Sequence, residues 1–405
     1  LKNKFMSKVL ISFLGTSQKV DNRKYRTADY KFNDGETITT SFIADAIRKH
    51  YKVDKLILIG TVRSMWEEVY ETFCGEEVDS DYSLNLYEYC VNANSQTELY
   101  LPSIEKIEQA LGKDSKVVLI KYGLNEQEIL FNQETILGID KYLEKNDELI
   151  LDITHSFRSL PLFLLNTIIY LQNVSLKNIS ISHVLYGMLD VSRELTYTPV
   201  VDLKSLLNTS EWIVGAYSFK EFGNAYKIAN LLKDENKSVY KRLIRFSDAK
   251  NLNYYDALSK QVQELQALRG DELPAIAQIV VEPIVEDYIR RMTPTDVRYM
   301  FQLKLAEWHF KKMNYSSSYL CLTESIISYV CTKVGLDDKN KENRDKAKDL
   351  MFKDGKFQPL RPIFNKVNSV RKQLAHNVEG AKRITDMIDI LENGLNDFKG
   401  IINTK

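Results

Sequence analysis

The sequence predicts two domains, an open α/β sheet domain over residues 1–205 and an all-helical domain over residues 206–405. In the first half, short apolar runs rich in β-branched residues alternate with segments of helical periodicity. After about residue 205 only the helical periodicity continues. The length of 405 residues supports the division, because a single hydrophobic core rarely serves so long a chain. Alternation of strands with helices predicts crossover connections and therefore an open parallel sheet.

Buried strands are predicted where apolar residues stand together, because a parallel sheet is covered on both faces. The predicted strands are 8–17, 55–64, 116–123, 148–156 and 179–189, with 196–203 as a hairpin partner of the last. Helices are predicted between them at 39–51, 64–73, 98–112, 126–143 and 160–173. In the second half, apolar residues recur every three or four positions over 211–232, 254–270, 297–313 and 318–335.

Composition is that of a globular protein, with 44% apolar and 27% charged residues. The four cysteines form no C-x-x-C pair, so we expect reduced thiols, a cytoplasmic location and no zinc site. No apolar run approaches ~18 residues and no signal-peptide pattern is present, so neither membrane insertion nor secretion is expected.

The net charge of zero hides an asymmetry along the chain. Residues 301–405 contain 19 Lys and Arg against 13 Asp and Glu, whereas residues 1–300 contain 36 against 42. A basic C-terminal part on a more acidic body is typical of a module that binds a polyanion. Chance is the alternative, because the excess is small for such a length.

Glycines, hydroxyls and arginines follow three of the predicted strands. Glycine lets backbone N–H groups approach an oxyanion, and a following helix N-terminus adds a favourable dipole. Arginine adds charge and planar hydrogen bonding to phosphate. Because ligands of such sheets bind beyond the carboxyl ends of the strands, we predict a site there for a phosphate-bearing ligand. The predicted binding residues are Gly15, Thr16, Ser17, Gly60, Thr61, Arg63, Thr154, His155, Ser156 and Arg158.

These glycines do not form a dinucleotide fingerprint, and no Walker Gly-Lys-Ser/Thr motif is present. Neither NAD binding nor nucleotide triphosphate hydrolysis is therefore indicated. The alternative is that the polar residues only cap the helices that follow the strands. His155 either stacks on a base or caps a helix. Asp152 is expected to order its loop, because no second carboxylate lies close in sequence.

A second candidate site lies in SVRKQLAHNVEG, residues 369–380, where Arg371 and His376 stand five apart. Apolar residues at four-residue spacing predict that this segment is helical. Five residues turn a helix by about 500°, which places the two side chains about 140° apart. One helix therefore makes a poor catalytic pair, whereas two copies about a two-fold axis would gather two Arg and two His at one cleft.

Such a composite site can cleave RNA without a metal or cofactor. His376 would act as general acid or base, and Arg371 would stabilise the charge of the phosphorane. The expected products are a 2′,3′-cyclic phosphate or 3′-phosphate and a 5′-hydroxyl. The spacing alone is a weak signal, and a solvated helix face is the alternative. Glu324 either pairs with Arg371 or is an ordinary polar edge residue.

Taken together, these segments resemble the CARF–HEPN proteins of type III CRISPR systems, which are ribonucleases activated by cyclic oligoadenylates. The resemblance covers nearly the whole chain. It rests on FLGTS (13–17), DITHSFRSLP (152–161), EWIVGAYSFKEFGNAYKIANLL (211–232) and RKQLAHNV (371–378). The segment 152–161 is the most specific, because it carries Asp, Thr, His and Arg in order on a strand-to-helix turn.

The resemblance implies a Rossmann-like CARF sensor, residues 1–205, and a HEPN ribonuclease domain, residues 206–405. The sensor would bind cyclic oligoadenylate, with cyclic tetra-adenylate expected, across a homodimer or higher oligomer. Binding would bias the helical domains towards cutting single-stranded RNA. Arg371 and His376 match the family's catalytic Arg and His. Where the family often has a small polar residue after that Arg, this chain has Lys372, and we expect the departure to affect only rate or substrate preference.

Two alternatives stay open. The helical domain could bind nucleic acid or a partner without cutting, as part of a nucleotide-sensing regulator. The basic region 241–250 keeps this interpretation open, although the sequence has no persuasive helix-turn-helix. The N-terminal domain could also slowly degrade its ring ligand, with His155 and the neighbouring hydroxyls as the reactive groups.

Overall fold

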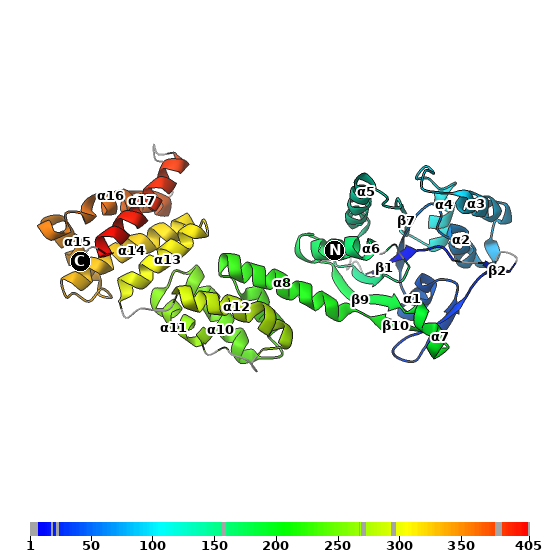
Figure 1. Cartoon of the computed structure of the whole chain (residues 1–405), viewed down its shortest axis with the longest axis horizontal. Helices are drawn as coiled ribbons and strands as arrows, with labels where there is room; N and C mark the ends of the chain where they lie inside the picture. The colour runs from blue at the N-terminus through cyan, green and yellow to red at the C-terminus, as the bar shows by residue number, and fades with distance from the viewer. Residues whose placement is uncertain are drawn as a thin grey trace, which may run out of the picture. The chain divides into compact units, whose positions relative to one another are not determined.

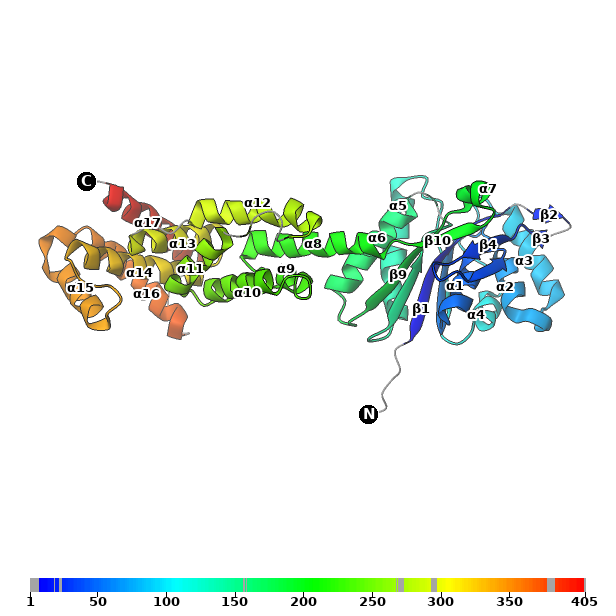
Figure 2. The same ribbon diagram turned by 90° about the horizontal axis from the view of Figure 1, so that it is seen from below.

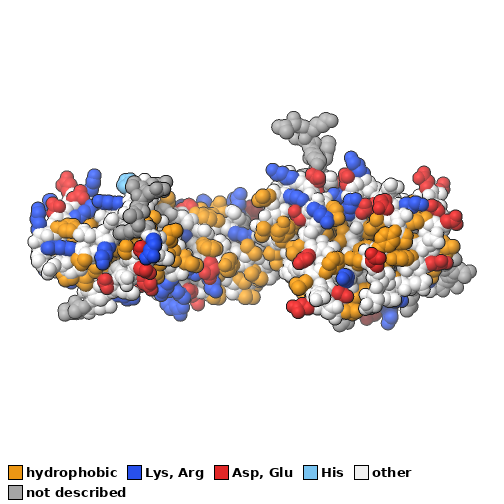
Figure 3. All heavy atoms as spheres, turned by 90° about the horizontal axis from the view of Figure 1, so that it is seen from above, with side chains coloured by type: hydrophobic (Ala, Val, Ile, Leu, Met, Phe, Trp, Pro, Cys, Tyr) orange, Lys and Arg blue, Asp and Glu red, His pale blue; other side chains and the backbone are white. Residues whose placement is uncertain are grey.

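The computed structural model of the chain describes residues 7–17, 19–21, 24–155, 157, 159–266, 268, 273–292, 297–376 and 383–403 (Figure 1). The chain divides into two compact units, Leu1–Asn208 and Thr209–Lys405. Within the described residues, no helix combines the length and hydrophobicity that a membrane span requires. On the face shown in Figure 3, both units expose hydrophobic side chains between the charged ones.

Strands occur in the N-terminal unit, together with the helices that connect them. The strands are β1 (Lys8–Leu14), β2 (Lys19–Asp21), β3 (Lys24–Tyr25), β4 (Ala28–Lys31), β5 (Thr37–Thr40), β6 (Lys55–Gly60), β7 (Lys116–Leu119), β8 (Glu148–Asp152), β9 (Ser180–Gly187) and β10 (Thr198–Asp202). The helices are α1 (Ile43–Tyr51), α2 (Trp66–Cys74), α3 (Ser80–Asn92), α4 (Ile104–Leu111), α5 (Glu126–Leu137), α6 (Leu160–Asn173) and α7 (Ser192–Leu195). Short 3-10 helices are η1 (Gly75–Glu77), η2 (Gly138–Tyr142) and η3 (Leu189–Val191).

The main sheet has eight strands in the order β5-β4-β10-β9-β8-β1-β6-β7. Five adjacent strands of this sheet, β9, β8, β1, β6 and β7, are parallel to one another. β10 is antiparallel to β9, as the predicted hairpin requires, and β4 and β5 form a further antiparallel pair that joins β10. The sheet is thus mixed at one end, because the tight turn between β4 and β5 permits only antiparallel pairing. β2 and β3 form a separate antiparallel hairpin.

Alternate residues of β1 enter different cores, as a strand buried on both faces requires. Leu10 and Leu14 pack with α1, α2, α3 and α4, whereas Val9 and Ile11 pack with α5 and α6. The two groups of helices lie on opposite sides of the sheet (Figure 2). The predicted α/β class of this unit is confirmed.

The C-terminal unit is helical throughout its described residues. The helices are α8 (Lys204–Phe222), α9 (Tyr226–Leu231), α10 (Lys237–Asn251), α11 (Tyr255–Gln266), α12 (Ala275–Met292), α13 (Arg298–Lys311), α14 (Tyr315–Lys333), α15 (Lys341–Lys353), η5 (Gly355–Phe357), α16 (Leu360–His376) and α17 (Ile384–Asn403). α14 is the central helix, because it packs against α13, α15, α16 and α17. The predicted all-α class of this half is confirmed.

Several predicted boundaries change in the structure. The helix expected over 39–51 begins only at Ile43, because the β-branched run Thr37–Thr40 forms β5 instead. The helix expected over 211–232 is two helices, α8 and α9, which separate at Gly223, where φ is +66°. Helix α3 and strands β2 to β5 were not predicted.

Candidate functional site

The predicted ligand loops lie at the point in the sheet where the chain changes the direction in which it adds strands, on either side of β1. β1 lies between β6 on one side and β8 on the other, and the chain visits β6 and β7 before it returns to β8 and β9. In open α/β sheets this reversal leaves a crevice at the carboxyl ends of the strands, where ligands bind. Residues 15–17, 61–65 and 153–155 follow these three strands and meet at that edge.

The loops after β1 and β6 are joined by hydrogen bonds. The Ser64 hydroxyl donates to the carbonyl of Leu14 at 2.7 Å and accepts from the backbone N–H of Thr61 at 3.1 Å. The backbone N–H of Met65 donates to the carbonyl of Gly15 at 3.2 Å. Ser64 therefore fixes the two loops to each other, and the backbone N–H of Thr61 is already occupied.

The loop after β8 is organised by Asp152, which is 0% exposed. Its carboxylate accepts from the Ser12 hydroxyl at 2.5 Å and from the Thr154 backbone N–H at 2.9 Å. Burial raises the pKa of Asp152, although these hydrogen bonds and nearby His155 oppose the shift. As expected from the sequence, Asp152 orders its loop.

His155 is held neutral at the mouth of this loop. Burial lowers the pKa of His155, and the Asp152 charge only partly offsets that effect. A neutral imidazole can stack on a base, and it can donate one hydrogen bond and accept another. It offers no positive charge to a phosphate. A Cβ on Gly15 would lie 3.2 Å from the Cβ of His155, so glycine allows the two loops to approach closely.

Three neighbouring cavities of about 450, 540 and 330 Å³ surround these loops, and Thr16 lines all of them. All the predicted ligand residues that the structure describes line at least one of the cavities: Gly15, Thr16, Ser17, Gly60, Thr61, Arg63, Thr154 and His155. Ser156 and Arg158 lie outside the described residues.

The cavities also reveal residues that the sequence analysis missed. The 450 Å³ cavity is lined by Arg26 and Thr27 before β4 and by Ser192 and Arg193 of α7. The 540 Å³ cavity is lined by Lys19 and Tyr25 of the β2–β3 hairpin, Glu67 of α2 and Tyr87 of α3. The basic and aromatic stretch 19–31 was a signal for the hairpin residues, but nothing in the sequence points to Arg193 or Tyr87.

Arg371 and His376 lie on α16, as the helical prediction requires. Arg371 is half-buried and its Nε donates to Oδ1 of Asn368 at 3.2 Å. His376 is the last residue of α16 and is exposed. Among the described residues Arg371 forms no ion pair, so its guanidinium keeps its charge available for another partner.

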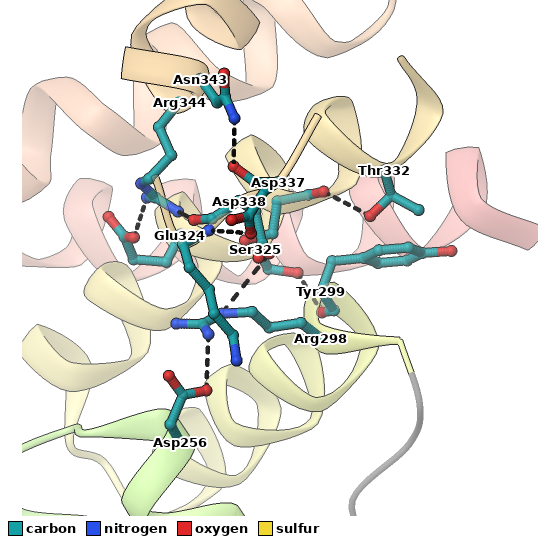
Figure 4. A network of polar contacts seen from close by, with 12 residues as sticks. Asp256, Arg298, Tyr299, Glu324, Ser325, Thr332, Asp337, Asp338, Asn343 and Arg344 are labelled. Atoms are coloured by element: carbon teal, nitrogen blue, oxygen red, sulfur yellow. Dashed lines mark hydrogen bonds and ion pairs between the residues drawn. The ribbon is translucent and has the colours of Figure 1, made fainter. Parts of the chain in front are cut away.

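The suggested pairing of Glu324 with Arg371 was wrong. Glu324 pairs with Arg344 of α15, whose Nη1 also donates to the Asp338 carbonyl at 3.2 Å (Figure 4). In the same network Arg298 donates to Asp256 at 2.7 Å. These contacts join α11, α13, α14 and α15, so Glu324 serves the internal structure of the unit.

One group of metal-ligating type occurs among the described residues, at a distance in sequence from every ligand loop. It consists of Asp34 and Glu36 in the β4–β5 turn and His50 near the end of α1. His50 stacks on Phe32, with ring centroids 3.9 Å apart, and its two ring nitrogens face the two carboxylates. This arrangement attaches the β4–β5 hairpin to α1.

Comparison with known proteins places these two units in a family. The CRISPR-associated protein MJ1674 of Methanocaldococcus jannaschii is 34% identical over 440 aligned residues, which cover 98% of this chain and 68% of that protein. The chain belongs to the MJ1674 family of CRISPR-associated proteins. Residues 9–190 match the CARF domain of the CRISPR system endoribonuclease Csx1, and residues 208–295 match the second domain of MJ1674. The expected resemblance to CARF-containing accessory proteins of type III CRISPR systems is confirmed.

A more remote similarity exists among solved structures. Enterococcus italicus Csm6, bound to cyclic hexa-2′-fluoro-hexa-dAMP, aligns with a TM-score of 0.40 and 11% identity. The alignment covers 98% of this chain and 93% of that one. The loops that follow β1, β6 and β8 lie within the CARF match of this MJ1674-family chain, whereas Arg371 and His376 of α16 lie beyond both matched domains.

Proposed function

We propose that this MJ1674-family protein is an antiviral endoribonuclease, specific for single-stranded RNA and activated by cyclic oligoadenylate. The activator, which we propose to be cyclic tetra-adenylate, binds at the three loops of the CARF unit. Cleavage takes place without a metal at Arg371 and His376 of the helical unit, which we assign to the HEPN class. The observation that carries the proposal is the meeting of the three polar loops at the reversal point of a Csx1-type CARF sheet.

The chemistry of the loops supports the choice of ligand. A ring of adenylates presents several phosphates together with aromatic bases. Exposed Thr16 and Ser17 hydroxyls and the cations of Arg63, Arg26 and Arg193 line the cavities and can bind the phosphates. Neutral His155 offers a face on which a base can stack.

The chemistry of α16 supports the reaction. His376 is exposed, so its imidazole can reach an RNA 2′-hydroxyl or a leaving 5′-oxygen and transfer a proton. Arg371 would stabilise the charge that develops on the phosphorane. Because the two side chains diverge on one helix, each complete site takes its groups from two copies of the chain.

Exposed apolar residues on the CARF unit support a homodimer. Leu130 of α5 and Leu162 and Leu165 of α6 are 55%, 64% and 38% exposed, although these two helices pack against each other. Such neighbouring apolar side chains are costly in water and are typical of a protein interface. We propose that a second copy covers them. Leu162→Glu should then reduce the fraction of dimer, which light scattering would detect as a lower average mass.

The deciding experiment is cleavage of a fluorogenic single-stranded RNA in EDTA, with and without cyclic tetra-adenylate or cyclic hexa-adenylate. The wild-type chain should cut the RNA only when cyclic tetra-adenylate is present. His376→Ala should bind cyclic tetra-adenylate normally and should not cut the RNA. Persistent cutting by His376→Ala would place the active site elsewhere.

A regulator that binds nucleic acid without cutting is the second candidate. Lys237, Lys241 and Arg245 of α10 are exposed at four-residue spacing and form one basic line. Lys250, which the sequence grouped with them, is buried and contributes nothing to this surface. Ring binding without cleavage in the assay above, together with RNA binding that is lost in Lys241→Glu, would favour this function.

A further inference from the structure

The 540 Å³ cavity changes its chemistry along its length. At one end it is lined by Thr16, Ser17 and Arg63, which suit phosphate. At the other end it is lined by Lys19, Tyr25, Glu67 and Tyr87, which we call the carboxylate arm. A smaller cavity of about 200 Å³ shares these four residues and continues the arm.

Glu67 carries an oxygen that lacks a partner. The side chain is in the first turn of α2 and is only 4% exposed. Its Oε1 accepts from the Tyr25 hydroxyl at 2.5 Å and ion-pairs with Lys19 at 3.4 Å. Its Oε2 is buried and accepts no hydrogen bond from the described residues. A buried acceptor without a donor is unfavourable, so a ligand that brings an N–H group there would gain a strong hydrogen bond.

Two aromatic rings stand beside this carboxylate with a cation between them. The Lys19 Nζ lies 3.6 Å from the ring centroid of Tyr87 and 4.6 Å from that of Tyr25. The ammonium thus covers the face of Tyr87 through a cation–π contact. Lysine is long and flexible, so a flat heterocycle can replace it on that face by stacking.

The remaining charges of the arm disfavour phosphate. Glu68 and Glu71 line the smaller cavity with Glu67, whereas Lys19 is the one cation among its lining residues. Burial, with the neighbouring Glu71 and Glu67 carboxylates, raises the pKa of Glu68, although a hydrogen bond from Ser41 opposes the shift. The arm therefore repels a phosphate and accepts a neutral group with N–H donors.

We propose that the carboxylate arm binds one adenine base of the cyclic activator, with the base stacked on Tyr87 and its N6 amine donating to Glu67. This inference rests on the proposed function, because it takes the ligand to be an adenylate ring. The adenine amine is a donor on an otherwise acceptor-rich edge, and a carboxylate can only accept. The two ends of the cavity then match the phosphate and the base of a single nucleotide.

The test compares binding of cyclic tetra-adenylate with binding of cyclic tetra-inosinate by isothermal calorimetry. Inosine replaces the N6 amine by a carbonyl oxygen, which would face the Glu67 carboxylate. Wild-type protein should therefore bind the adenylate ring more tightly by about tenfold or more. Glu67→Gln keeps an acceptor for Tyr25 and adds an amide donor, so it should reduce this preference severalfold. An unchanged preference in Glu67→Gln would overturn the proposal.

Two variants of Tyr87 provide a matched pair. Tyr87→Phe keeps the stacking face and should bind the adenylate ring as the wild type does. Tyr87→Leu loses the face and should bind about tenfold more weakly, with an unchanged melting temperature. Equal affinities for the two variants would exclude stacking on Tyr87. If the wild-type protein bound neither ring, the proposed function itself would fail, whereas ring binding that is indifferent to Glu67 and Tyr87 would reject this inference alone.

Discussion

On helix α16 the Nε of Arg371 donates to the Oδ1 of Asn368, one turn earlier, at 3.2 Å. The contact restricts the guanidinium of the Arg that we assign to catalysis, and leaves its other nitrogens without an ion pair among the described residues. Asn368 therefore supplies a small polar neighbour to Arg371 from the preceding turn. Lys372, which follows Arg371 on the same helix, is exposed.

Asn368→Ala is expected to reduce RNA cleavage by about tenfold, because a freely rotating Arg371 must be ordered in each transition state. Ring binding, measured by calorimetry, should not change. Asn368→Asp keeps an acceptor for Nε and should recover most of the activity, and Ser369→Ala, an exposed neighbour, should match the wild type. Equal loss in Asn368→Asp and Asn368→Ala would argue against a positioning role.

This relationship could not be predicted from the sequence. The spacing of Arg371 and His376 defines a motif, but any residue three or four positions away on a helix can reach either side chain. The sequence suggested Glu324 as a partner, and the fold gives that carboxylate to Arg344 instead. A tertiary ion pair depends on which helices pack together, and hydrophobic periodicity alone does not determine that packing.

Gly60 belongs to a predicted ligand loop, and the structure gives a second reason for a glycine at this position. The sequence suggested a glycine that lets a ligand approach the backbone. In the structure a Cβ on Gly60 would lie 2.7 Å from Cζ2 of Trp66 and 2.8 Å from Oγ of Ser64. Trp66 and Ser64 therefore leave no room for a side chain at residue 60, whatever ligand binds nearby.

Gly60→Ala should lower the free energy of unfolding by about 1–3 kcal/mol, because the indole of Trp66 has to shift within a filled core. Gly138→Ala is the control, since nothing lies within 4 Å of its added Cβ and its φ of −65° is ordinary for alanine. That variant should remain within about 0.5 kcal/mol of the wild type. Urea denaturation of both variants would measure the difference, and equal stabilities would contradict the steric argument.

The strands that precede the three predicted ligand loops were predicted well, whereas the far edge of the sheet was not. β1, β6 and β8 are mostly apolar and almost entirely buried, so their burial on both faces is visible in the sequence. β4 and β5 are short and half-exposed, and they acquire strand geometry from pairing with each other and with β10. The residues in and before β4 that line the 450 Å³ cavity were not predicted, because the sequence carries no signal for this strand.

Asp152→Ala should destabilise the chain by about 2–4 kcal/mol, because it leaves the Ser12 hydroxyl and the Thr154 N–H unpaired in a buried site. Asp152→Asn should cost clearly less. Burial raises the pKa of Asp152, which shows that the charged form is disfavoured there, and the amide keeps an acceptor without a charge. Thermal unfolding of the two variants provides the comparison. A larger loss for the Asn variant would mean that the carboxylate charge itself holds the loop.

His309 gives the helical unit a dependence of stability on pH. The side chain is 1% exposed on α13, and burial together with the charge of Lys250 lowers its pKa to about 3. In the unfolded chain an ordinary histidine titrates near ~6.5. Between these values the unfolded chain binds a proton that the folded chain does not, so stability rises with pH in this window and is lost as pH falls through it.

The slope from this one group is at most about 1.4 kcal/mol per pH unit, and it should be measured between pH 5 and 6.5, above the titration of most carboxylates. His309→Leu removes the group and should flatten the dependence of unfolding free energy on pH in that range. His376→Ala, which removes an exposed histidine from the same unit, is the matched control and should keep the wild-type slope. A slope in His309→Leu equal to that of the wild type would show that the buried imidazole is not what makes the protein sensitive to mild acid.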